Sequence, residues 1–267
     1  MSQEEIHQDI HHGISSDVKN HDNPLIFSIG HRCTTASLIK IMNLKFESYP
    51  FDWVVSKLET IKYCIENDFC DFLEEQNYEG IHSDTMNIVD GKYKELTNEY
   101  IVYNRHYEDT MVTHVNNNCD NARGTYGYML ALTHHDMRND KNKAYFERCI
   151  NRFRNILSLQ KKKYYLYINP IMGNQDFETS VVTSMLEFIK FSEFMTTKTI
   201  QSHGLYFFIV KNEERKHEVE KIFDSNSLTI FVAYTNQNLD DAGGVFDGDF
   251  YNEQYQILLA IEKIVKQ

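Results

Sequence analysis

The sequence has no long apolar run. No stretch approaches the roughly 20 apolar residues that a transmembrane helix needs, although 42% of its 267 residues are hydrophobic. Residues 1–23 also lack the apolar segment of a secretory signal. We therefore expect a cytoplasmic protein without a membrane partner, with a disordered leader at residues 1–23 and a single domain at residues 24–267.

Positive charge is scarce as well. Lys and Arg number 27 against 39 Asp and Glu, which gives a formal net charge of −12 at pH 7. The one short basic cluster is residues 161–163, directly before an apolar run. Proteins that bind nucleic acids usually present a basic face, so we expect no nucleic-acid partner.

Cysteine is limited to five residues, and no C-x-x-C pair occurs. An odd count without such a pair argues against a disulfide framework or a structural zinc site. The glycine-rich phosphate loop, the dinucleotide fingerprint, the H-E-x-x-H zinc motif and the G-x-S-x-G elbow are missing too. Carboxylates gather at residues 240–249, but their spacing is not that of an EF-hand loop and favours an acidic surface loop. We expect no cofactor and no metal.

What the sequence does contain is an alternation of strand and helix patterns. Short apolar runs predict strands at residues 25–29, 100–103, 126–133, 164–168, 205–210 and 228–234. Helical periodicity predicts helices at residues 34–42, 57–73, 144–159, 177–202, 213–223 and 252–266. This alternation predicts an α/β fold: a single three-layer domain with a mostly parallel central sheet flanked by helices.

The first candidate site lies where the strand at residues 25–29 turns into the next helix. The residues there are Ser28, Ile29, Gly30, His31, Arg32 and Cys33. Ligands of α/β proteins bind at this end of the strands, and the N–H groups of a helix N-terminus lower a thiol pKa and stabilise an oxyanion. His31 and Arg32 add to this effect if they point inward. Cys33 is therefore a candidate nucleophile, although its spacing alone favours a buried, inert cysteine.

A nucleophilic thiol needs a base, and histidine supplies one near neutral pH. His135 follows a predicted strand and precedes Asp136, a carboxylate that could orient an imidazole. The chain has 12 histidines, and His106 and His114 compete for the same role.

The third candidate is the turn at residues 50–53, Pro-Phe-Asp-Trp, which holds the single tryptophan. Asp52 could orient a histidine, and Trp53 could contact a substrate. The alternative, favoured by the residue types alone, is a packed turn whose aspartate caps the next helix. Ser56 is a second candidate for that cap.

Taken together, four motifs are more specific than any one of them. They are Ser28-Ile29-Gly30-x-x-Cys33, Ser48-x-Pro50-Phe51-Asp52-Trp53, His135-Asp136 and Phe146-Glu147-Arg148-x-Ile150-x-Arg152-Phe153. In order and rough spacing they resemble the family catalogued as "putative papain-like cysteine peptidases", found in bacteria and in large DNA viruses. The resemblance covers residues 25–168 well and the remainder loosely. It implies a nucleophile at Cys33, a partner at His135 and, for a viral chain, a place in the host cytoplasm or the virion. The chain departs from the family's usual arginine pair at Arg148-Cys149.

The order of elements and the family's name predict different folds. In papain-like enzymes the cysteine opens a long central helix and the histidine lies on a mostly antiparallel sheet. Here a strand directly precedes Cys33, and the second half of the chain alternates strand and helix, which favours a three-layer α/β hydrolase. Thiolate–imidazole pairs recur on unrelated folds, so the chemistry is independent of this choice.

The leading hypothesis is a cysteine-dependent hydrolase, peptidase-like or acyl-transferring. Cys33 attacks, His135 is the base, and Asp52 or Asp136 orients the imidazole. The residues expected to contact substrate are Ser28, Gly30, His31, Arg32, Trp53 and His106. Two alternatives are a non-catalytic α/β binding or structural protein and a carbohydrate-active enzyme such as a glycosyltransferase. The sequence leaves open the oligomeric state and whether the substrate is a peptide, an acyl compound or a glycan.

Overall fold

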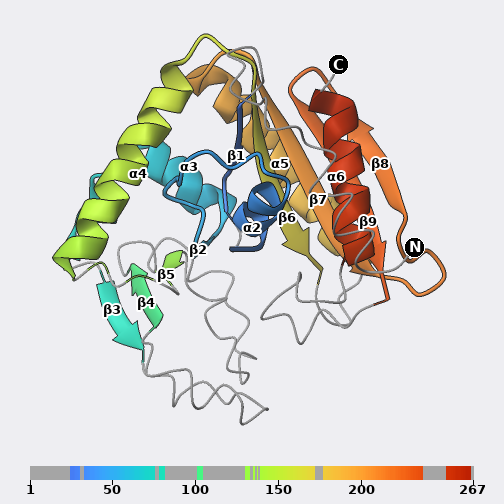
Figure 1. Ribbon diagram of the computed structural model, residues 1–267, viewed down its shortest axis with the longest axis horizontal. Helices are drawn as coiled ribbons and strands as arrows, with labels where there is room; N and C mark the ends of the chain where they lie inside the picture. Colours follow the sequence, from blue (N-terminus) through green and yellow to red (C-terminus); the bar gives the residue numbers. More distant parts are fainter. Residues whose placement is uncertain are drawn as a thin grey trace.

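The computed structural model describes residues 25–30, 33–75, 78–81, 101–104, 130–132, 135, 137, 139–171, 177–236 and 251–265 (Figure 1). The helices are α2 (Cys33–Ile41), α3 (Leu58–Glu66), η1 (Asp71–Leu73, a 3-10 turn), α4 (Asp140–Ser158), α5 (Phe177–Lys198) and α6 (Tyr251–Val265). The strands are β1 (Leu25–Ser28), β2 (Val54–Ser56), β3 (Tyr78–Ile81), β4 (Ile101–Asn104), β5 (Leu130–Leu132), β6 (Lys163–Pro170), β7 (Ser202–Lys211), β8 (Val219–Asp224) and β9 (Leu228–Thr235). No helix of this described part is both long and apolar enough to cross a membrane.

The main sheet has five strands in the order β1-β6-β7-β9-β8. β1, β6, β7 and β9 run parallel, and β8 pairs with β9 in the antiparallel sense. β6 and β9 are buried along almost their whole length, as expected for parallel strands with both faces covered. The predicted α/β class with a mostly parallel sheet is confirmed.

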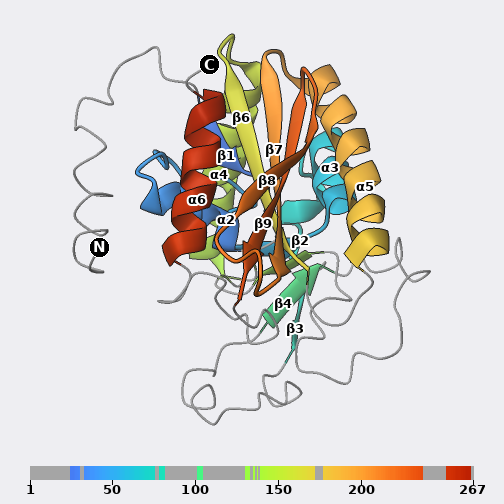
Figure 2. The same cartoon turned by 90° about the vertical axis from the view of Figure 1, so that its right-hand side faces the viewer.

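Helices cover both faces of this sheet (Figure 2). On one face Phe27, Tyr165 and Tyr206 pack with residues of α3, α4 and α5. On the other, Leu166 and Phe207 pack with residues of α2 and α6. This gives the three predicted layers, and it leaves the carboxyl ends of the parallel strands at one edge, where β1 leads into α2.

The structure also contains a second sheet, which the sequence does not predict as a unit. It has four strands in the order β2-β5-β4-β3, and all of their pairings are antiparallel. β2 lies between α2 and α3 in the chain, so this sheet starts from the segment that follows the turn at residues 50–53. Its strands have three or four residues each, too few for a period-2 pattern to stand out in the sequence.

The helix predicted at residues 213–223 is wrong. The chain instead makes a turn and then forms β8. The side-chain oxygen of Asn212 accepts hydrogen bonds of 3.1 Å from the backbone N–H groups of Glu214 and Arg215. His217 then takes a φ of 68°, a left-handed conformation that a right-handed helix cannot contain. The charge-rich composition looks helical and Asn212 is placed as a helix cap would be, but the left-handed His217 ends any helix within its first turn.

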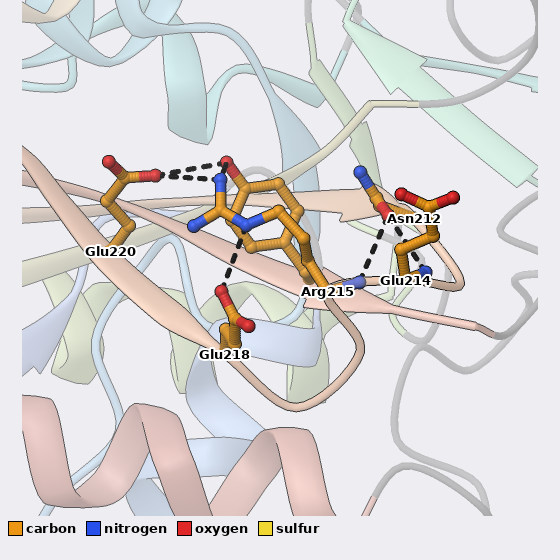
Figure 3. Close-up of polar contacts among 6 residues, drawn as sticks. Asn212, Glu214, Arg215, Glu218 and Glu220 are labelled. Atoms are coloured by element: carbon orange, nitrogen blue, oxygen red, sulfur yellow. Dashed lines mark hydrogen bonds and ion pairs between the residues drawn. The ribbon is translucent and has the colours of Figure 1, made fainter.

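Arg215 holds this turn against β9 (Figure 3). Its guanidinium lies 4.1 Å from the ring centroid of Tyr234 and donates a 2.7 Å hydrogen bond to the Tyr234 hydroxyl. It also pairs with Glu218 at 2.9 Å and with Glu220 at 3.0 Å. Two carboxylates neutralise the one guanidinium, so this network is a structural clamp and has no charge left for an anionic ligand.

A buried lysine joins the ends of two helices. The Lys163 ammonium donates to the carbonyl of Leu159, the residue that caps the C-terminus of α4, at 2.7 Å. It also donates to the carbonyl of Ile200, just beyond α5, at 2.8 Å. Carbonyls at helix ends have no partner within the helix, so one side chain satisfies two of them. Burial lowers the Lys163 pKa.

Lys163→Met is expected to lower the free energy of unfolding by about 2–4 kcal/mol, because it leaves two partly buried carbonyls without their donor. Since the pKa of folded Lys163 is lowered, the unfolded chain keeps this proton to higher pH. The wild-type protein should therefore gain stability as pH rises from the lowered pKa towards about 10.5, and the variant should lack that gain. Urea unfolding between pH 7 and 10 measures both effects. Lys141→Met, at an exposed position of α4, is the control, and an equal loss there would contradict the role given to Lys163.

Candidate active site

The predicted strand–turn–helix around Cys33 is present. β1 ends at Ser28 and α2 begins at Cys33, at the carboxyl edge of the parallel strands. The Ser28 hydroxyl accepts a 3.1 Å hydrogen bond from the backbone N–H of Gly30. The Thr35 hydroxyl, one turn into α2, donates a 2.9 Å hydrogen bond to the Gly30 carbonyl. These bonds fix the turn from both sides and place Cys33 at a helix N-terminus. The side chain of Cys33, and the whole of residues 31 and 32, lie outside the described residues.

Gly30 brings the turn at residues 50–53 against the β1–α2 turn. Gly30 has a φ of 100°, in the region that favours glycine. A Cβ at this position would lie 2.5 Å from the Ser56 hydroxyl oxygen and 3.4 Å from the Phe51 carbonyl oxygen. Two motifs that are some 20 residues apart in the sequence are therefore in direct contact, three residues before Cys33.

Asp52 stabilises the turn that contains it. Its carboxylate is buried; Oδ2 pairs with the Lys45 ammonium and accepts a 2.8 Å hydrogen bond from the backbone N–H of Tyr49. Burial raises the Asp52 pKa, and Lys45 opposes that rise. The other oxygen, Oδ1, has no hydrogen-bond partner within the described part of the chain. The expectation that Asp52 caps the following helix is wrong, because its carboxylate is directed back to Tyr49.

The cap expected from Ser56 is also absent. Ser56 is the last residue of β2, and Lys57 takes the N-cap position of α3 without a side-chain hydrogen bond. The buried Ser56 hydroxyl has no hydrogen-bond partner among the described residues and lies against Gly30. Trp53, the other predicted contact residue of this segment, is partly buried.

His135 lies against α4. Its ring stacks on Tyr145, with the ring centroids 4.8 Å apart and the planes 25° from parallel. It also meets Phe146 edge-on at 5.5 Å. His135 is half-buried, so its imidazole is held between two rings while part of it stays accessible. The other predicted partners, Asp136, His106 and His114, lie outside the described residues.

Tyr145 connects His135 to the surroundings of Asp52. After burial, which is the largest cause, Ser48, the Cys149 thiol and the Asp52 charge all influence the pKa of its phenol. Burial raises the Tyr145 pKa to about 12, so the phenol stays protonated at neutral pH. The structure therefore brings His135 and the turn of Asp52 to the same part of α4. Lys45 and Tyr145, which make these links, carry no sequence signal beyond their residue types.

Cys149, the residue after Arg148 on α4, is a second thiol close to this group. It is fully buried, and burial first, with the Asp52 charge also contributing, raises its pKa. A raised pKa keeps the thiol protonated and unreactive. Cys149 is thus a packing residue, and Cys33 remains the candidate nucleophile.

In the described part of the chain, no three His, Cys, Asp or Glu side chains gather in a group that could hold a metal ion. The acidic segment at residues 240–249 lies outside it.

Comparison with known proteins agrees with the family resemblance of the sequence. The profile of a family described as "Putative papain-like cysteine peptidase (DUF1796)" matches residues 24–210. The match spans β1, the Cys33 turn, Asp52, His135 and the parallel strands up to β7. No curated protein and no solved structure matches the chain significantly.

Proposed function

The chain belongs to the family described as "Putative papain-like cysteine peptidase", and we propose that it is a cysteine-dependent hydrolase or acyl transferase with Cys33 as its nucleophile. One observation carries the proposal: α2 begins at Cys33 directly after a parallel strand, in a turn that Gly30 fixes against a second family motif. Thiols at helix N-termini have lowered pKa values because the helix dipole and free N–H groups favour the thiolate.

In this proposal His135 is the general base. Stacking on Tyr145 and edge-on contact with Phe146 restrict the imidazole to one orientation, and a fixed base is what proton transfer requires. Two carboxylates are candidates to orient the ring further. Asp136 is its chain neighbour, and Asp52 has in Oδ1 an acceptor that no described group occupies.

The reaction follows from these roles. His135 takes the thiol proton, and the Cys33 sulfur attacks an acyl carbon while backbone N–H groups at the start of α2 stabilise the oxyanion. Collapse of this intermediate breaks the bond to the leaving group, which takes the proton from His135, and leaves a thioester. Water then releases the acid and the free thiol, or a second nucleophile takes the acyl group. The substrate class is a peptide or another acyl compound.

The proposal is tested by alkylation of the folded protein with iodoacetamide between pH 5 and 9, read for each cysteine by mass spectrometry. Cys33 is expected to react at least about tenfold faster at pH 7 than Cys70, with an apparent pKa well below the ~8.5 of a free thiol. Cys70 is the control because it is exposed and its pKa is raised, first by desolvation and then by Asp71.

A second arm tests the base. His135→Ala should raise the apparent pKa of Cys33 towards that of a free thiol, whereas His217→Ala, in the β7–β8 loop, should leave it unchanged. A Cys33 that reacts no faster than Cys70, or only after unfolding, would contradict the proposal and favour a non-catalytic protein. If Cys33 reacts fast and its apparent pKa does not change in His135→Ala, Cys33 remains the proposed nucleophile and the base is instead His106 or His114.

A further inference from the structure

A groove opens at the amino ends of the parallel strands, whereas Cys33 lies at their carboxyl ends. The groove lies between α6 and the amino ends of the parallel strands, beside the β8–β9 hairpin, and encloses about 610 Å³. Lys162 precedes β6, His203 and Thr229 stand near the starts of β7 and β9, and Lys263 comes from the last turn of α6. Its volume is in the range of small-molecule sites, roughly 300–1,000 Å³.

The charge of this groove is opposite to that of the chain. Against a net charge of −12, its lining holds three lysines, Lys162, Lys221 and Lys263, and one carboxylate, Asp224. Asp224 pairs with Lys221 at 2.5 Å. No carboxylate of the described residues pairs with Lys162 or Lys263. Two uncompensated ammonium groups in one groove of an acidic protein indicate a site for an anion.

The groove also has a fixed polar floor. His203 Nε2 lies 2.8 Å from the Thr229 hydroxyl, which donates a 2.9 Å hydrogen bond to Asp224. Since that hydroxyl donates to Asp224, it accepts from His203, which fixes the ring. The other ring nitrogen of His203, Nδ1, lies 3.3 Å from the Asn226 carbonyl oxygen. The positions of these groups are therefore set before any ligand arrives, which limits the ordering cost of binding.

Part of the remaining lining is apolar, beside the polar side chains of Ser225 and Gln256. Phe231 from β9 and the α6 residues Leu259 and Ala260 face the groove, and the Lys162 ammonium lies 5.3 Å from the centre of the Tyr164 ring. A simple inorganic anion would pair with the lysines but would make no contact with this apolar wall of Phe231, Leu259 and Ala260. A ligand with an anionic end and an apolar or aromatic body would use both.

We propose that this groove binds a phosphorylated small molecule of nucleotide size. Lys162 and Lys263 hold the phosphate, and the wall of Phe231 and α6 packs against the body of the ligand. By contrast, Arg215, a cation beyond the carboxyl end of β7, is already neutralised by two glutamates. The proposal is independent of Cys33, because the two sites lie at opposite ends of the parallel strands.

The test is isothermal titration of the full chain with AMP, adenosine and inorganic phosphate. AMP is expected to bind more tightly than either of its parts. Lys162→Gln combined with Lys263→Gln should weaken AMP binding by about tenfold or more, because hydrogen bonds to charged groups are lost. Lys190→Gln, an exposed position on α5 at the other face of the sheet, is the matched control and should change nothing.

A salt titration of the wild-type protein does not depend on how the variants fold. Raising NaCl from about 50 to about 500 mM should weaken AMP binding several-fold by screening. AMP that does not bind more tightly than about 10 mM, or that binds the double variant and the wild type equally, would overturn the proposal. Phosphate binding as tight as that of AMP would overturn the role given to the apolar wall.

Discussion

Replacement of Lys45 by methionine is expected to lower the free energy of unfolding by about 3–5 kcal/mol at neutral pH, because it leaves a buried carboxylate without its counter-ion. The side chains of Asp52 and Lys45 are 1% and 12% exposed. Without Lys45, the carboxylate keeps, among the described residues, only the backbone N–H of Tyr49 as a donor. Methionine preserves most of the volume of lysine, so the loss reports charge and hydrogen bonding more than packing. Equilibrium urea unfolding at pH 7 measures it.

The loss should depend on pH in a defined direction. Burial raises the pKa of folded Asp52, and Lys45 opposes this rise, so removing Lys45 raises the pKa further. A raised acid pKa favours the protonated folded state: its contribution is present at low pH and is lost as pH rises through the folded pKa. The deficit of Lys45→Met should therefore be smallest near pH 4 and grow towards pH 7.

Two further variants separate this explanation from a general weakening of the turn. Adding Asp52→Asn to Lys45→Met should recover a large part of the loss, because no buried charge is then left unpaired. Arg154→Met breaks an exposed pair, with 2.7 Å between Arg154 Nε and Asp68 Oδ1, and should cost no more than about 1 kcal/mol. A pH-independent deficit, or a double variant less stable than Lys45→Met, would contradict the role of the Lys45–Asp52 pair.

The Lys45–Asp52 pair also shows what sequence reasoning could not reach. The apolar run at residues 25–29 and the glycine after it predict a strand and a turn from local chemistry, and the structure agrees. The aromatic neighbours of Asp52 mark it as a candidate, but its partner Lys45 lies seven residues earlier with no motif to mark it. Pairing of buried charges depends on which side chains tertiary packing leaves without water, and single-sequence patterns do not encode that.

The same limit explains the errors around β8 and β2. Alternating charges after Asn212 are compatible with a helix by propensity, yet the clamp of Arg215 on Tyr234 and the pairing of β8 with β9 select a turn and an edge strand. Ser56 looked like a helix cap because serine is common there, but pairing with β5 places it in a strand. In both cases a contact with a distant strand overrides a local preference.

Gly30→Ala is expected to lower the free energy of unfolding by about 3–5 kcal/mol, the sum of two separable costs. The first is conformational, because alanine rarely adopts the φ of 100° found at Gly30. The second is steric, because the new Cβ would lie 2.5 Å from the Ser56 hydroxyl oxygen. That oxygen belongs to a buried strand residue, so it has little room to move.

Ser56→Ala isolates the steric part. The Ser56 hydroxyl is buried without a hydrogen-bond partner among the described residues, so its removal alone should change stability by less than about 1 kcal/mol. In the double variant the clash is gone and the conformational cost remains, so its stability should lie between those of Gly30→Ala and the wild type. Losses that simply add would mean that Gly30 and Ser56 are not in contact. An intermediate stability would confirm that the β1–α2 turn and β2 are in contact at Gly30. The alkylation rate of Cys33 in this double variant then measures how far the reactivity of the thiol depends on that contact.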